Sequence, residues 1–121
     1  MANKCLDFGE VKLNFSDATF YCSTYGNKVS QLSINNAFEN NEVSQALQSM
    51  GYKCDQYYLD LKRNGSNWVW LNGESTSYRN WKNGYPTNDN TQNCVSFDTQ
   101  TGSWYNTGCD TQQCFICQLY A

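Results

Sequence analysis

Seven cysteines in a chain of 121 residues constrain the fold more than any other feature of this sequence. Such a density is ordinary in secreted domains and high for a cytosolic chain. Three uses of the thiols compete: a zinc ribbon, a redox pair and structural disulfides. A ribbon needs two close pairs, but only Cys114 and Cys117 have C-x-x-C spacing, and they lie in an apolar run typical of a strand. Structural disulfides are therefore predicted, and the odd count leaves at least one thiol unpaired or shared between chains.

The cysteine usage predicts a secreted or extracellular protein. Two N-x-S sequons, at Asn14 and Asn64, are consistent with glycosylation, although such sequons often arise by chance in an Asn-rich chain. Residues 1–5 are polar and lack the apolar core of a signal peptide, a pattern typical of a mature chain.

The absence of histidine excludes several kinds of chemistry. It rules out Ser-His and Cys-His catalysis, His-ligated zinc and a histidine pH switch. The chain also has no paired-carboxylate motif and no Gly-rich phosphate loop, so we expect no enzyme activity and no catalytic residue. A net charge of −3 argues against a nucleic-acid partner. A mean hydropathy of −0.71 without a long apolar run argues against membrane insertion.

Two helices are predicted in the first half of the chain. The first runs from Ser16 as N-cap to a stop at Gly26, with Cys22 on its inward face. The second starts near Asn36, whose spacing from a following Glu resembles a capping box, and ends at Gly51. Its apolar stripe is typical of core packing.

Strands and one long loop account for most of the remaining chain, and the length predicts a single domain over residues 1–121. The expected strands are residues 6–15, 57–61, 67–71, 94–97, 103–106 and 115–120. Residues 72–93 are rich in Asn, Ser, Thr and Gly and have no periodic signal. A loop of this length inside a compact domain is usually functional. The predicted fold class is α+β.

A set of Cys, Trp and Gly motifs extends along nearly the whole chain, from about Leu6 to Tyr120. In order they are Cys22, Y-L-D-L at Tyr58–Leu61, W-V-W-L-N-G from Trp68, Asn80-Trp81, Tyr85-Pro86-Thr87, Cys94, Gly102-Ser103-Trp104, Cys109 and F-I-C-Q ending at Gln118. Together they resemble the C-type lectin-like domain. The resemblance implies two helices and two small antiparallel sheets with a long irregular loop, stapled by disulfides.

The resemblance also implies two disulfides, Cys22–Cys117 and Cys94–Cys109. The residues are consistent with the first pair, because Cys22 faces inward from a predicted helix and Cys117 lies on an apolar strand. In the chain-entropy model the two bridges contribute roughly 4–5 and roughly 3 kcal/mol, because the first closes the longer loop.

Three cysteines, Cys5, Cys54 and Cys114, lie outside the basic family pattern. Residues 114 and 117 of a strand point to opposite faces. If Cys117 faces the first helix, Cys114 faces the side where the second helix is expected, and Cys54 follows that helix. We therefore hypothesise a third bridge, Cys54–Cys114. Cys5 is then a free thiol or a link between two chains, so the protein is expected to be a monomer or a dimer.

The family's calcium and sugar site is where this sequence departs most from the pattern. Sugar-binding members have an E-P-N or Q-P-D tripeptide, a Glu before the next Cys, and a W-N-D motif. The corresponding positions here hold Tyr85-Pro86-Thr87, Gln92 and Trp104-Tyr105-Asn106. None of the five expected ligand positions holds a carboxylate, the group that carries most of the affinity for calcium. We therefore expect no metal ligand and no cofactor.

Two interpretations of Asp89 stay open. With Asn88 and Asn90 it could form part of a displaced calcium site, or the three residues could be a solvated turn, which is the favoured reading. Pro86 is the only proline and follows a tyrosine. The resemblance implies a cis peptide bond there.

Aromatic side chains with amide and hydroxyl neighbours suit contacts with proteins and stacking on sugar rings. Trp68, Trp70, Trp81 and Trp104 are expected in the core, which leaves Tyr85 and Tyr105 as the better candidates for exposed contacts. The candidate ligand-binding residues are Tyr85, Thr87, Asn88, Asp89, Asn90, Gln92, Tyr105 and Asn106.

The expected function is that of an extracellular, non-catalytic recognition domain resembling C-type lectins. It would bind a protein or glycan ligand through the long-loop surface without calcium. Two alternatives remain: a calcium-dependent carbohydrate-binding lectin with an unorthodox site near Asp89, and adsorption to a surface such as ice.

Overall fold

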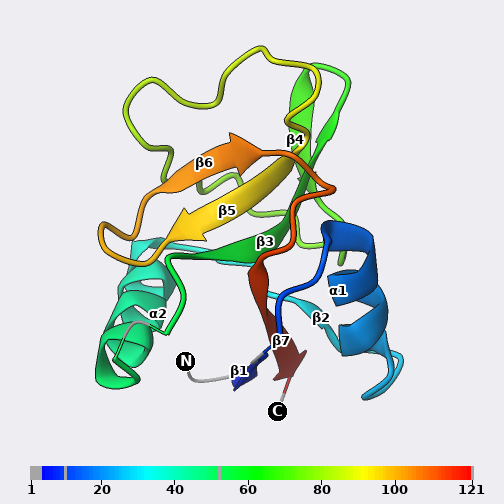
Figure 1. Ribbon diagram of the computed structural model, residues 1–121, viewed down its shortest axis with the longest axis vertical. Helices are drawn as coiled ribbons and strands as arrows, with labels where there is room; N and C mark the ends of the chain where they lie inside the picture. The colour runs from blue at the N-terminus through cyan, green and yellow to red at the C-terminus, as the bar shows by residue number, and fades with distance from the viewer. Residues whose placement is uncertain (1–3, 10, 52, 121) are drawn as a thin grey trace.

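The computed structural model describes residues 4–9, 11–51 and 53–120, and two helices and seven strands lie in these ranges (Figure 1). They are β1 (Lys4–Phe8), α1 (Phe15–Ser23), β2 (Ser30–Gln31), α2 (Ala37–Ser49), β3 (Gln56–Asn64), β4 (Asn67–Trp70), β5 (Cys94–Asp98), β6 (Trp104–Thr107) and β7 (Cys114–Tyr120). The α+β prediction is confirmed, although β2 was not expected. Neither helix in the described ranges is long and apolar enough to cross a membrane.

Helix α1 begins two residues earlier than predicted, after Asn14 rather than after Ser16. Asn14 has an extended backbone, and its side chain accepts a hydrogen bond from the backbone N–H of Asp17 at 2.8 Å, which makes Asn14 the N-cap. The earlier start places Phe15 in the first turn, where its ring is buried against Tyr58. The strand expected over residues 6–15 is therefore wrong in its second half, because β1 spans Lys4–Phe8 and residue 15 is helical. Burial of the Phe15 ring thus decides between two polar residues that are both good caps.

Helix α2 follows its prediction closely. The side chain of Asn36 accepts a hydrogen bond from the backbone N–H of Glu39 at 2.9 Å. The carboxylate of Glu39 in turn accepts one from the backbone N–H of Asn35 at 3.0 Å, so the two side chains cap the helix start reciprocally. Gly51 follows the helix with φ of 82°, a conformation that favours glycine.

The strands form one continuous sheet from two antiparallel groups. The strand order is β1-β7-β3-β5-β6, with β2 beside β7 and β4 beside β3. The two expected antiparallel sheets are present, and a short parallel pairing of β3 with β7 joins them. Figure 1 shows α1 and α2 on either side of the β1–β7 end, whereas the long loop extends beyond β4 and β6.

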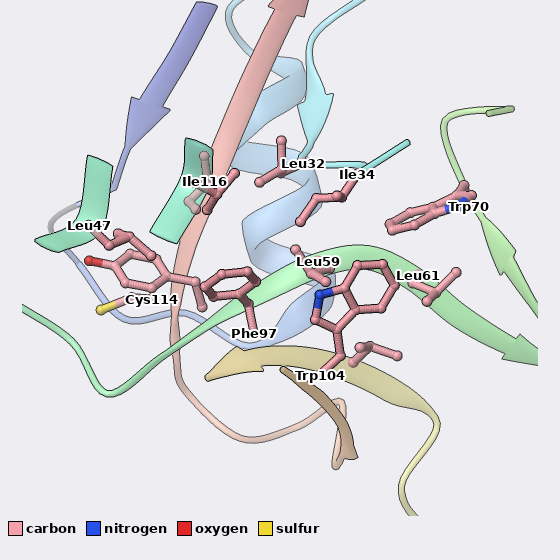
Figure 2. Packing of buried hydrophobic residues seen from close by; sticks show 13 residues of the cluster. Leu32, Ile34, Leu47, Leu59, Leu61, Trp70, Phe97, Trp104, Cys114 and Ile116 are labelled. Atoms are coloured by element: carbon pink, nitrogen blue, oxygen red, sulfur yellow. The ribbon is translucent and has the colours of Figure 1, made fainter. Parts of the chain in front are cut away.

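Alternation along β3 divides the core into two clusters. Leu59 and Leu61 belong to the larger one, whereas Tyr58 points to the smaller one beneath α1. Trp104 is fully buried in the larger cluster, near Leu59 and Leu61 in Figure 2. Its indole N–H donates to Oδ1 of Asn40 at 2.8 Å, so the polar atom at the centre of the core has a partner.

The four tryptophans all pack on the larger cluster, as predicted. Trp70 and Trp104 are buried members, and Trp68 and Trp81 are partly buried against them. Trp81 also forms an isolated bridge with Trp104, which anchors the long loop to the edge strand β6. The next residue strengthens this anchor, because the backbone N–H of Lys82 donates to the carbonyl of Trp104 at 2.7 Å.

Three disulfides staple the described part of the chain: Cys22–Cys117, Cys54–Cys114 and Cys94–Cys109. Two are those that the resemblance implied, and the other is the bridge hypothesised from the strand alternation. Cys22 is buried, which agrees with the inward face expected for it. Cys5 has an exposed, unpaired thiol on β1.

Candidate functional site

The long loop is fastened to β6 by the side chain of Asn106, which is 2% exposed. Its Oδ1 accepts a hydrogen bond from the backbone N–H of Thr87 at 2.9 Å, and this contact fixes the orientation of the amide. Its Nδ2 then faces three oxygens: the carbonyl of Thr87 at 3.2 Å, Oγ1 of Thr87 at 3.0 Å and the carbonyl of Gln92 at 3.0 Å. An amide donor therefore occupies the point on which these loop oxygens converge.

The guanidinium of Arg63, at the end of β3, holds the same loop. It lies over the ring of Trp68, with Cζ 4.5 Å from the ring centroid. Its donors reach the carbonyls of Thr87, Asp89 and Gln92 at 2.9, 3.3 and 3.4 Å, and Oδ1 of Asn93 at 2.9 Å. Arginine suits this position because it carries a permanent charge and five donors in a fixed plane. The positive charge that binds the loop carbonyls is thus the side chain of Arg63 itself.

The residues at the family's calcium-ligand positions do not fit a calcium ion. Calcium takes about six to eight oxygen ligands, mostly from carboxylates and carbonyls. Here Asn106 turns its donors toward the loop oxygens, and the carbonyls of Thr87 and Gln92 also accept from Arg63. Within the described ranges, no group of three or more His, Cys, Asp or Glu residues could hold a metal ion.

Asp89 lies in a turn on the exposed crest of the loop, which we define as residues 88–90. Its Oδ1 accepts from the hydroxyl of Thr91 at 2.7 Å and from the backbone N–H of Thr91 at 2.9 Å. These two hydrogen bonds lower the pKa of Asp89, so the carboxylate is ionised at neutral pH. The contacts are those of an Asx turn, the structure favoured for this segment from the sequence.

A hollow of about 400 Å³ lies between the middle of the long loop, the start of β3 and the β5–β6 hairpin. Strand register brings two of the lining residues together, because Gln56 at the start of β3 pairs with Asp98 at the end of β5. A turn in the loop brings Lys82 and Tyr85 to the opposite side, since the backbone N–H of Tyr85 donates to the carbonyl of Lys82 at 2.9 Å. The hollow is lined by Asp55, Gln56, Lys82, Tyr85, Asp98, Gln100 and Tyr105. The peptide bond before Pro86 is cis, as the resemblance implied.

Two aromatic rings and an ion pair form one side of the hollow. The centroids of Tyr85 and Tyr105 are 5.9 Å apart, with their planes inclined at 65°. The ammonium of Lys82 lies 5.4 Å from the ring centroid of Tyr105 and 2.8 Å from Oδ2 of Asp98. Tyr85 is 36% exposed, so its ring remains accessible.

The ion pair is charged at neutral pH. The hydrogen bond to Asp98 raises the pKa of Lys82. Burial favours the neutral form of Asp98, but hydrogen bonds from Lys82 and from the backbone N–H of Gln100 outweigh it and lower the pKa of Asp98. Burial raises the pKa of Tyr105, so its phenol is neutral.

The eight candidate ligand residues divide among three places. Tyr85 and Tyr105 line the hollow, Thr87, Gln92 and Asn106 hydrogen-bond beneath the loop, and Asn88, Asp89 and Asn90 form the crest. Sequence reasoning missed Asp55, Gln56, Arg63, Lys82, Asp98 and Gln100. Only the pairing of β3 with β5 brings several of these together, and no local motif marks them.

Comparison with known proteins agrees with the fold. The model of the lectin C-type domain matches residues 11–119. Lithostathine of Rattus norvegicus is 28% identical over 121 residues, covering 97% of this chain and 73% of that protein. A perlucin-like protein of Mytilus galloprovincialis is 32% identical over 119 residues, covering 93% and 74%. The carbohydrate-recognition domain of the mouse scavenger receptor C-type lectin superposes with a TM-score of 0.84 and 26% identity, covering 99% of this chain and 91% of that one.

Proposed function

The chain belongs to the C-type lectin domain family, and we propose that it is an extracellular, non-catalytic recognition domain that binds a protein or glycan through its long-loop surface without calcium. Three disulfides are consistent with an oxidising extracellular environment. A carbohydrate-recognition domain of similar fold, that of the mouse scavenger receptor C-type lectin, supports a glycan as one class of ligand.

The observation that carries the proposal is the use of the loop oxygens by this chain's own donors. Asn106 and Arg63 together donate to the carbonyls of Thr87 and Gln92. Hydrogen bonds to a charged group contribute about 1.5–3 kcal/mol each, and those between neutral groups about 1 kcal/mol. The loop therefore has an internal source of order that does not vary with calcium concentration.

The crest and the neighbouring tyrosine supply suitable contact chemistry. Asn88, Asp89 and Asn90 are exposed and carry amide and carboxylate groups, and Tyr85 adds an accessible ring. Rings next to hydrogen-bonding groups are common at the centres of recognition surfaces. This combination favours binding over catalysis.

The test is thermal unfolding in EDTA, in excess calcium and in excess magnesium as an ionic control. We expect the same Tm in all three, because an ion that does not bind the folded state does not stabilise it. A rise of several degrees in calcium alone would overturn the proposal. It would favour a calcium-dependent lectin with its site near Asp89, and Asp89→Asn would then abolish the rise.

A further inference from the structure

A second hollow, of about 370 Å³, lies between β1, the segment that follows β1 and the C-terminal end of α1. We call it the α1 hollow, and it is lined by Asp7, Phe8, Gly9, Val11, Tyr21 and Tyr25. Its volume lies in the range of small-molecule sites. The residues predicted to bind a ligand lie in the long loop and on β6, so the proposed function leaves the α1 hollow unused.

The fold brings the side chain of Asp7 to the face of the sheet that α1 covers. Its neighbours Leu6 and Phe8 pack against the larger core cluster, so alternation along β1 turns Asp7 to the opposite face. Asp7 also pairs with Cys117 of β7, and the disulfide from Cys117 to Cys22 holds α1 over that face. Strand register and this disulfide thus bring Asp7 to the end of α1.

Tyr21 and Tyr25 form an aromatic corner in the α1 hollow. Their ring centroids are 5.7 Å apart, and their planes are inclined at 71°. The hydroxyl of Tyr25 donates to that of Tyr21 at 3.2 Å, and the ring of Tyr21 also packs edge-on against Phe115. Tyr21 is 36% exposed and Tyr25 is 52% exposed, so a ligand can reach both rings.

Gly9 lets the chain pass close to the ring that supports this corner. Its backbone N–H donates to the carbonyl of Phe115 at 3.1 Å, and a Cβ at this position would lie 2.7 Å from Cζ of the Phe115 ring. Gly9 therefore lines the α1 hollow without a side chain. The chemistry of the hollow comes mainly from the carboxylate of Asp7, the two tyrosine rings and the exposed side chain of Val11.

The electrostatics of the α1 hollow favour a cation. Asp7 is the one charged residue among the described residues that line it, and no Lys or Arg within the described ranges forms an ion pair with Asp7. The hydrogen bond with Tyr21 and the charge of Asp7 raise the pKa of Tyr25 to about 12, so its phenol is neutral at physiological pH. A cation would be attracted both by the carboxylate and by the faces of the two rings.

The hydrogen-bonding groups of the α1 hollow distinguish one kind of cation from another. A primary ammonium has three N–H donors and a guanidinium has five, and each donor that loses water without gaining an acceptor costs free energy. Apart from the Asp7 carboxylate, the side chains here offer ring faces, a valine and two phenol oxygens that already bond to each other. A quaternary ammonium has no N–H donor, and its methyl groups suit the rings and the valine.

We propose that the α1 hollow binds a quaternary ammonium group, with its methyl groups against Tyr21, Tyr25 and Val11 and its charge facing Asp7. A small soluble molecule such as choline and the phosphocholine headgroup of a lipid both carry this group. The inference goes beyond the proposed function, because the site is separate from the long loop and requires neither calcium nor a glycan.

The test is an NMR titration with choline and with its neutral carbon analogue, in which a tert-butyl group replaces the trimethylammonium group. We expect choline to shift the ring signals of Tyr21 and Tyr25 with a Kd of about 1 mM, and the neutral analogue to bind at least about fivefold more weakly. Equal affinities would overturn the inference, because apolar contact alone would then account for the binding. The absence of any shift with choline would also overturn it.

Variants of the α1 hollow locate the binding. Tyr25→Ala and Asp7→Asn should each weaken choline binding by about fivefold, whereas Tyr25→Phe should keep most of it because the ring remains. Phe38→Ala and Asp55→Asn are the matched controls, since both residues are exposed and lie outside the hollow, Phe38 on α2 and Asp55 just before β3. The Tm of each variant shows that it is folded. Choline affinity that survives either Tyr25→Ala or Asp7→Asn would overturn the assignment of the site.

Sedimentation with phosphatidylcholine vesicles distinguishes the two sources of the group. Sedimentation that excess choline and Tyr25→Ala both abolish would support the inference with a lipid headgroup as the ligand. Choline binding without sedimentation would support it with a small soluble molecule as the ligand. Neither result depends on whether calcium changes the Tm, so this inference and the proposed function can fail separately.

Discussion

Asn106 and Thr87 exchange hydrogen bonds in both directions at the base of the long loop. Oδ1 of Asn106 accepts from the backbone N–H of Thr87 at 2.9 Å, and its Nδ2 donates to Oγ1 of Thr87 at 3.0 Å. Since Asn106 is 2% exposed, these bonds are shielded from water. The geometry of the loop is thus set by contacts within the chain.

Replacing Asn106 with aspartate keeps an acceptor for Thr87 but removes both donors and brings a carboxylate among three oxygens. We expect Asn106→Asp to lower the free energy of unfolding in EDTA by about 2 kcal/mol, measured by urea denaturation. Asn88→Asp adds the same charge on the exposed crest, where we expect a change below about 0.5 kcal/mol. Equal losses of unfolding free energy in the two variants would show that the added charge, and not the lost donors, causes the effect.

The guanidinium of Arg63 is expected to keep the loop closed. Arg63→Met leaves the carbonyls of Thr87 and Gln92 without that donor, so hydrogen exchange at the backbone amides of these two residues should accelerate about tenfold. Mass spectrometry or NMR measures the rates. Lys28→Met removes an equal charge at an exposed position and should leave them unchanged. Unaltered exchange in Arg63→Met would mean that Asn106 alone orders the loop.

The sequence predicted helices, strands and disulfides correctly where they depend on residues close together in the chain or on alternation along one strand. Asn36 caps α2 as expected because its partner lies three residues away. The bridge Cys54–Cys114 followed from alternation along a strand. Prediction failed at the start of α1, where Asn14 and Ser16 are both suitable caps and only burial of a neighbouring ring selects between them.

The site was predicted less completely, for a physical reason. Arg63 binds backbone carbonyls, which every residue has, so its partners leave no signature in the sequence. The ion pair Lys82–Asp98 joins a loop to a strand end 16 residues later. Such contacts depend on the path of the loop, which has no periodic pattern to reveal it.

Asp60 should make stability depend on pH. It is 2% exposed, and burial raises its pKa from 3.8 to about 7 despite a hydrogen bond from the backbone of Asn72. Between about pH 4 and pH 7 the folded protein holds a proton that the unfolded chain has released, so the free energy of unfolding falls as pH rises. The interval corresponds to about 4 kcal/mol at most.

Asp60→Asn isolates this contribution because an amide retains the acceptor for Asn72 and does not titrate. Urea denaturation from pH 4 to pH 8 should show the wild type losing stability relative to Asp60→Asn, with the difference levelling above about pH 7. Parallel curves for the two proteins would show that Asp60 is ionised in the fold throughout this range.

The bridge Cys54–Cys114 should contribute more to stability than Cys94–Cys109. The first spans 60 residues and the second 15, so the chain-entropy model gives about 4 and about 3 kcal/mol. Urea denaturation of the two double alanine variants should therefore differ by about 1 kcal/mol. Cys5→Ser is the control, since the Cys5 thiol is exposed and unpaired, and it should match the wild type. The reverse order of losses would show that packing around the bridges in the folded state, rather than restriction of the unfolded chain, sets their contribution.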